Sequence, residues 1–288
     1  MTNMATPGVL PASLSDAALA RESEIAQAAI RRHRSVIIGL RLLVLVVVLG
    51  GWELAARYKW IDPFFYSQPS MIWNQIVEWL RDGTSQCPLW VQVAVTLEET
   101  VIGFLIGSIA GVICGILLGR NKLLSDVFSL YIQIANSIPR VVLGSVFVIA
   151  LGLGMASKVA LAVVMVFFVV FGNAFQGVRE ADKYMIANAQ ILGASPRQLT
   201  TAVVIPSAMS WILASLHVSF GFALVGAVVG EFLGAKEGIG LLISTAQGAF
   251  NASGVFAAMI VLAVVALLAD FLLTTLEKRL LKWRPAAF

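Results

Sequence analysis

The chain has 288 residues, of which 59% are hydrophobic and 12% are charged, and its mean hydropathy is +0.90. Soluble globular proteins are about 45–50% apolar and about 25% charged. This composition excludes a soluble enzyme and a disordered chain, and the net charge of +4 is too small to indicate nucleic-acid binding. Two cysteines at unrelated positions predict neither a disulfide framework nor a metal site. We therefore predict an integral membrane protein, embedded in a lipid bilayer.

The first 34 residues are polar and rich in alanine. They are too long and too acidic for the first region of a signal peptide, so no cleavage is expected. We predict a cytoplasmic N-terminal tail over 1–34, within which 13–30 either form a weak amphipathic helix on the membrane surface or stay disordered. The transmembrane domain is predicted over 35–288.

Six apolar stretches are long enough to cross about 30 Å of hydrocarbon, which takes about 20 helical residues. They cover roughly 36–56, 95–119, 127–152, 157–177, 211–234 and 255–275. Strands of a membrane barrel would alternate in polarity and be only about 10 residues long. The predicted fold class is thus all-α, with six transmembrane helices.

Lysine and arginine set the predicted orientation. With the N-terminus inside, most of the 20 Lys and Arg residues lie in cytoplasmic segments, as the positive-inside rule requires. Lys158 is among the few assigned to the outer side. Both termini of this multi-pass protein are therefore expected in the cytoplasm.

Glycines recur at four-residue spacing in two of the spans, at 103, 107, 111, 115 and 119 and again at 226, 230 and 234. On a helix this spacing makes a groove that another backbone can approach closely. We favour tight helix packing over a sliding gate as its role.

The third span contains Asn136, Ser137, Pro139 and Arg140 near its middle. Proline removes a backbone hydrogen bond and can kink the helix. A cation in mid-membrane must face protein or a water-filled cavity. Arg140 either attracts an anionic solute or pairs with a buried carboxylate such as Glu231, and these residues form the candidate translocation pathway.

The loop over 178–210 is the longest internal cytoplasmic connection, and half of it is apolar. Residues 183–192 have helical spacing of apolar positions, Gly193 breaks that helix, and Ser195 is predicted to cap a second short helix that begins at Pro196. A helix–glycine–helix projection is typical of a docking surface for a partner.

This loop resembles the EAA loop of bacterial ABC-transporter permeases, whose pattern is Glu-Ala-Ala, three residues, Gly, nine residues, Ile-x-Leu-Pro. Here Gly193 is followed by nine residues and Val203-Val-Ile-Pro206, whereas the Glu-Ala-Ala positions read Ala187-Asn188-Ala189, so the glutamate is missing. Residues 60–284 look like the nitrate/sulfonate/taurine/bicarbonate branch of these permeases. The motifs that carry this likeness are, in order, Ser137-Ile-Pro-Arg, Gly152-Leu-Gly154, Ser157-Lys158, Gly193-Ala-Ser195 and Glu231-Phe-Leu-Gly-Ala235.

The resemblance implies a type I importer permease in the bacterial inner (plasma) membrane, carrying a small anionic solute. The implied partners are a second permease subunit, taken as a second copy, two cytoplasmic ABC ATPases and an external solute-binding protein. The positions carried over to the ATPase-coupling loop are Ala187, Asn188, Ala189, Leu192, Gly193, Ala194, Ser195, Pro196, Arg197, Leu199 and Pro206.

The sequence agrees that ATP is bound by a separate subunit. The chain has no GxxxxGK[ST] loop that could cradle nucleotide phosphates, so ATP and Mg are expected on the ATPase and no cofactor or catalytic site in this chain. The alternative is a secondary transporter or channel that works without an ATPase. Secondary transporters, however, tend to have paired broken helices in two related halves, and here a single kinked span is predicted.

Overall fold

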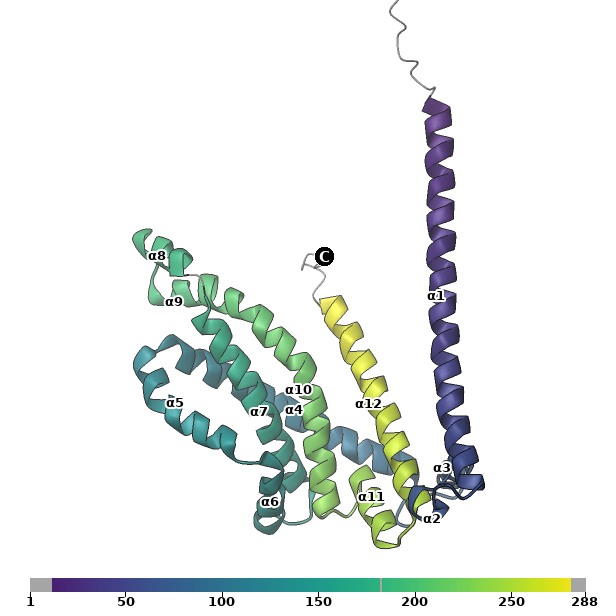
Figure 1. Ribbon diagram of the computed structural model, residues 1–288. Helices are drawn as coiled ribbons and strands as arrows, with labels where there is room; N and C mark the ends of the chain where they lie inside the picture. The colour runs from purple at the N-terminus through teal and green to yellow at the C-terminus, as the bar shows by residue number, and fades with distance from the viewer. Residues whose placement is uncertain (1–11, 182, 281–288) are drawn as a thin grey trace, which may run out of the picture. The chain divides into compact units, whose positions relative to one another are not determined.

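The computed structural model describes residues 12–181 and 183–280, and within these ranges the regular structure is helical (Figure 1). Five helices are long and apolar enough to cross a membrane, and a bent helix pair makes a sixth span if it is counted as one. The predicted all-α membrane fold is confirmed. The chain divides into two compact units, residues 1–63 and 64–288, and each is described by itself.

The first unit is built on α1, Ala12–Arg57. Its apolar part, Arg31–Arg57, is long enough to span a bilayer, and its valine and leucine side chains are exposed. Such a surface is stable only in hydrocarbon. The predicted boundary at residue 34 falls inside this helix, so the described part of the tail, from Ala12 onward, is helical rather than disordered. Residues 1–11 lie outside the described residues.

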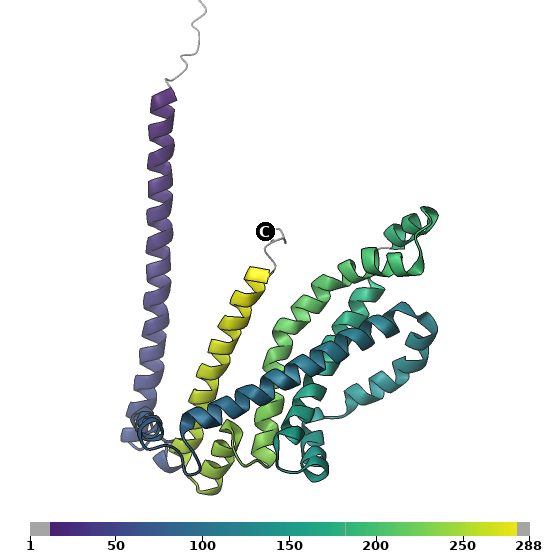
Figure 2. The same ribbon diagram turned by 180° about the vertical axis from the view of Figure 1, so that it is seen from behind.

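The core of the second unit is α7, Met155–Arg179, which packs against α4, Leu89–Arg120, and α10, Ile205–Leu233. Figures 1 and 2 show α4 crossing α7 and α10 obliquely. The fifth span is longer than the predicted 211–234, because consecutive helical segments follow one another without a break in the helical backbone from Pro196 to Leu233.

The glycines of α4 and Gly226 and Gly230 of α10 face α7, whereas Gly234 faces Val148 and Leu153. A Cβ added at Gly111 of α4 would lie 3.0 Å from the carbonyl oxygen of Phe167 and the amide nitrogen of Phe171, and one added at Gly226 of α10 would lie 2.7 Å from the Cα of Ala162. The backbones therefore touch where only glycine leaves room. The predicted close approach of a second backbone is confirmed.

The third span is broken at the proline where the sequence predicts a kink, and the break is sharper than a kink within one helix. α5, Lys122–Ser137, ends before Pro139, and the chain restarts as η1, Arg140–Val142, and α6, Leu143–Leu151, at an angle of 74°. Proline has no amide hydrogen and clashes with the preceding turn, so the helix ends at this point.

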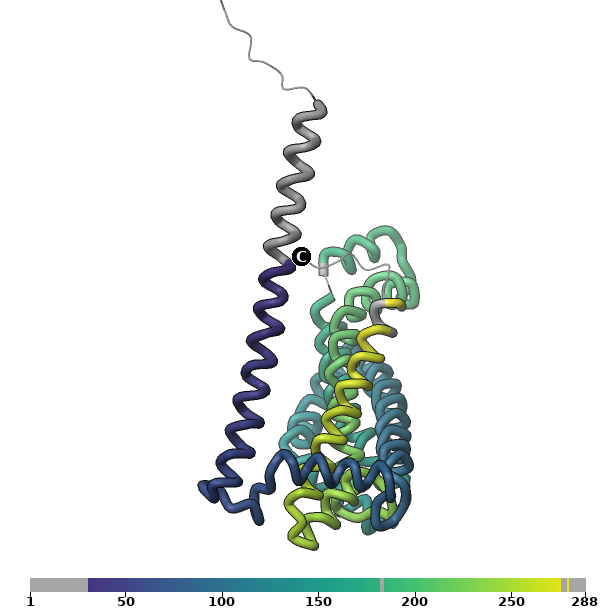
Figure 3. Tube along the Cα trace, turned by 90° about the vertical axis from the view of Figure 1, so that its right-hand side faces the viewer, coloured from purple at the N-terminus to yellow at the C-terminus, as the bar shows by residue number. Residues whose placement is uncertain are grey.

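Short helices complete the second unit. α2, Pro63–Tyr66, and α3, Pro69–Arg81, precede α4, and α3 crosses the beginning of α12, Ala252–Leu280 (Figure 3). α11, Ile239–Gly248, packs on α10 and α12. At the other end of this unit lie α8, Lys183–Ile191, α9, Pro196–Leu199, and η2, Thr200–Val204 (Figure 1).

Candidate functional site

The predicted helix–glycine–helix arrangement is present at α8 and α9. Gly193 joins the helices with φ +81°, in the left-handed region that glycine adopts without strain. The Ser195 hydroxyl accepts the amide of Gln198, whose side chain in turn accepts the Ser195 amide, so the predicted serine cap is confirmed as a reciprocal capping box at Pro196. Two short helices are thereby held in a fixed turn.

The outward face of this loop is apolar and exposed. Tyr184, Ile191 and Leu192 are 83%, 83% and 87% exposed. A cluster of exposed apolar side chains is typical of an interaction site. Leu192 belongs to the predicted coupling positions, whereas Tyr184 and Ile191 do not. The sequence could have indicated Tyr184 and Ile191 too, because both are apolar residues close to the break at Gly193. These three residues are called the loop tip below.

The other predicted loop positions divide between the two faces of the loop. Ala187, Asn188, Ser195, Arg197 and Pro206 are exposed. Ala194, Pro196 and Leu199 line a groove of about 340 Å³ between the loop and the ends of α4 and α7. Ala189 is half-buried. Ala194, Pro196 and Leu199 therefore position the loop on the bundle, and the exposed residues face outward.

The predicted pathway residues lie at the break between α5 and η1. Asn136, Ser137 and Pro139 are exposed, and Arg140 is half-buried. The Arg140 Nη2 donates to the Asn136 Oδ1 at 2.6 Å, and its guanidinium lies 4.9 Å from the centre of the Phe168 ring on α7. The Arg140 Nε is buried and has no hydrogen-bond partner. An arginine held in this way keeps its positive charge at the break between α5 and η1, where it can attract an anion.

Glu231 does not pair with Arg140 among the interactions of the described residues. It is fully buried near the end of α10, where Oε1 accepts the Thr96 hydroxyl at 2.6 Å and Oε2 accepts the Gly240 amide at 2.7 Å. Glu231 is thus the buried carboxylate that the sequence analysis named, but donors from α4 and α11, rather than Arg140, replace water around it.

Two further buried ionisable residues escaped the sequence analysis. Glu99 on α4 is 2% exposed and Lys158 on α7 is 1% exposed, although the sequence assigned Lys158 to an outer loop. The Lys158 Nζ donates to the carbonyl oxygens of Leu153 and Gly154 at 2.7 and 3.1 Å. The signal in the sequence was that both charges fall inside predicted spans, Glu99 in 95–119 and Lys158 in 157–177.

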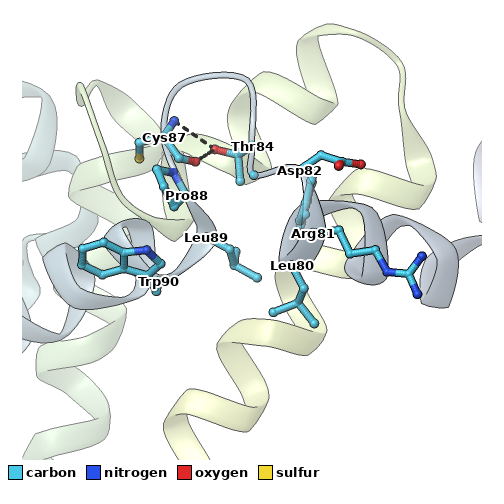
Figure 4. Close-up of a pocket in the computed structure, with 10 residues that line it drawn as sticks. Leu80, Arg81, Asp82, Thr84, Cys87, Pro88, Leu89 and Trp90 are labelled. Carbon is cyan, nitrogen blue, oxygen red and sulfur yellow. Dashed lines mark hydrogen bonds between the residues drawn. The ribbon is translucent and has the colours of Figure 1, made fainter.

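A pocket of about 410 Å³ opens where α3 turns into α4, with Leu80, Leu89 and Trp90 along it (Figure 4). Thr84 closes the turn by donating its hydroxyl to the Cys87 carbonyl at 2.6 Å. Burial, and secondarily the Glu237 carboxylate, raises the pKa of the Cys87 thiol, so the thiol stays neutral and poorly reactive. None of the predicted pathway residues lines this pocket.

Comparison with known families matches residues 103–282 to the binding-protein-dependent transport system inner membrane component. The chain is 29% identical over 243 residues to the putative aliphatic sulfonates transport permease protein SsuC of Bacillus subtilis, covering 84% of this chain and 87% of that protein. It is 26% identical over 245 residues to the taurine transport system permease protein TauC of Escherichia coli, covering 85% and 89%.

Solved structures resemble this fold at lower identity. An inward-facing form of the MetNI methionine ABC transporter aligns with a TM-score of 0.57 and 19% identity, over 67% of this chain and 96% of that chain. An amino acid ABC transporter structure aligns with a TM-score of 0.52 and 20% identity, over 65% and 92%. These likenesses concern the helical arrangement alone.

Proposed function

The chain belongs to the family of binding-protein-dependent inner-membrane transport components and is the membrane-spanning permease of an ABC importer, and we propose that its solute is a small anion. The observation that carries this proposal is Arg140, a half-buried cation at the broken span that Asn136 and Phe168 hold in place. The relatives named for aliphatic sulfonates and taurine support the same class of solute. A sulfonate or carboxylate of modest size suits one guanidinium donor.

Replacing Arg140 by alanine tests this role. A charge-assisted hydrogen bond contributes about 1.5–3 kcal/mol, so Arg140→Ala should lower solute uptake by about tenfold or more while the complex still assembles. Uptake of radiolabelled taurine or sulfonate into cells, with the complex quantified in the same membranes, measures both. The matched control is Arg57→Ala, which removes an exposed arginine from the first unit and should leave uptake unchanged. A collapsed complex would assign Arg140 a structural role instead.

The partners of the proposed importer follow from the same family membership. Permeases of this kind work with an ATPase and a binding protein. We assign to this chain a second copy of itself, two cytoplasmic ATPases that bind ATP and Mg, and an external solute-binding protein. Both termini and the loop of α8 and α9 then lie in the cytoplasm. The loop tip, with its exposed apolar side chains, is the surface that supports ATPase docking.

Co-purification tests the importer. A tagged chain extracted gently from native membranes should carry a stoichiometric ATPase, identified by mass spectrometry. Leu192→Asp should weaken that association by about 30-fold, because loss of a central apolar anchor costs about 2 kcal/mol or more. Gln190→Glu adds the same charge to α8 without removing an apolar side chain and should retain the ATPase. A chain that purifies alone and moves solute in liposomes without ATP would instead be a secondary transporter.

A further inference from the structure

Three ionisable side chains from three helices meet at the end of the bundle opposite α8 and α9: Glu99 of α4, Lys158 of α7 and Glu231 of α10. Each is at least 98% buried, and each interacts electrostatically with the other two. Buried charges are stable in a membrane protein only when they are paired or neutralised. Two carboxyl groups and one ammonium cannot all be charged and leave the cluster neutral.

The two carboxyl groups differ in their donors. Glu231 accepts from Thr96 and Gly240, one donor on each oxygen, which is the environment of an ionised carboxylate. Glu99 has no such support: its Oε2 is buried without a hydrogen-bond partner, and the nearby Glu231 carboxyl acts on it electrostatically. A buried carboxyl group with an oxygen that has no donor, beside a second carboxylate, is stable only when it binds a proton.

The remaining groups around Glu99 do not supply a second compensating charge. The Lys158 ammonium donates two of its three hydrogens to backbone carbonyls, and it provides the single positive charge of the cluster. The other charged group that acts on Glu99 is the Glu98 carboxylate, which is exposed on the same helix and has the wrong sign. The loop before α11 contributes neutral amides, from Gly238 to the Gln92 side chain and from Ile239 to the Thr96 hydroxyl.

We propose that this cluster is a proton-binding site, in which Glu99 holds one proton at neutral pH and donates it in a hydrogen bond to ionised Glu231, whose charge Lys158 balances. The cluster is then neutral. Its hydrogen bonds join α4, α10 and α11, so the proton stabilises the closed packing of these helix ends. Gly238 belongs to the same arrangement: its φ of +119° and the Glu231 carboxyl beside it leave no room for a side chain.

Infrared spectroscopy of the full-length chain in lipid nanodiscs tests the proposal. At about pH 7.5 an ordinary glutamate is ionised, so a protonated-carboxyl C=O band that shifts in deuterated buffer reports a retained proton. We expect this band in the wild-type chain and its loss in Glu99→Gln. Glu98→Gln is the matched control, one position along the same helix and exposed, and should keep the band.

Each result decides the question. A wild-type chain without the band overturns the proposal, and so does a band that survives Glu99→Gln. Because glutamine has the shape of a protonated glutamate and donates in the same place, Glu99→Gln should also insert and purify at the wild-type level. Failure of this variant to fold, while Glu98→Gln folds, would mean that Glu99 is ionised in the native protein and would likewise overturn the proposal. The readout does not depend on transport, so it is independent of the solute proposed above.

Discussion

Gly107→Leu is expected to lower the free energy of unfolding by about 3 kcal/mol, the upper part of the range for overpacking a tight interface. A Cβ at this position would lie 2.8 Å from the Val163 carbonyl oxygen and 2.8 Å from the Val166 Cβ, and the first of these belongs to the α7 backbone. A side chain can rotate away, but a helix backbone cannot, so α4 and α7 must separate. Thermal unfolding of the detergent-purified chain, followed by fluorescence size-exclusion, measures the loss.

Gly172→Leu is the matched control for this substitution. Gly172 lies on α7 itself, and a Cβ there would meet no atom within 4 Å. The same residue change should therefore leave the unfolding midpoint unchanged or raise it slightly, since leucine favours a helix over glycine by roughly 0.8 kcal/mol. Equal losses in the two variants would contradict a steric role for the α4 groove and would indicate a general intolerance of leucine in this chain.

Gly193→Pro is expected to abolish solute uptake while the protein still inserts into the membrane. Proline fixes φ near −65°, whereas Gly193 has φ +81°, and proline also lacks the amide that Gly193 donates to the Gln190 carbonyl at 3.0 Å. The turn between α8 and α9 must then open, and the loop tip loses its position relative to the bundle. Uptake assays, with immunoblotting of the membrane fraction, separate the two effects.

Asparagine at the same position isolates the backbone conformation as the cause. It enters the left-handed region more readily than other residues with a side chain, so Gly193→Asn should retain measurably more uptake than Gly193→Pro. Full uptake by the proline variant would contradict a coupling role for this loop. A Cβ at Gly193 would meet no atom within 4 Å, so equal loss in both variants would contradict the φ angle as the cause.

Local patterns in the sequence predicted the parts of this protein that depend on neighbours in the chain. Hydropathy gave the membrane class because about 20 apolar residues in a row have no other stable surroundings. The capping box at Ser195 involves residues three apart, so the sequence alone located the start of α9. The glycine repeat predicted a groove, since every fourth residue lies on one helix face.

Only the tertiary structure decided which residues meet. Arg140 interacts with Asn136, one turn earlier, and with Phe168 of α7, while Glu231 interacts with Thr96 and Gly240. The contacts of Glu231 join segments more than a hundred residues apart as well as neighbours, and no hydropathy window contains that information.

Lys158 is the clearest case. Placed by the positive-inside rule, it counts as an outer-loop charge, yet it is buried where α7 packs against α4 and α10. The sequence determined where the chain crosses the membrane, because each spanning helix satisfies its own backbone hydrogen bonds and places its own apolar side chains in lipid. Whether a charged residue beside a span is solvated or buried depends on the donors and opposite charges that other helices bring to it, and these exist only in the folded bundle.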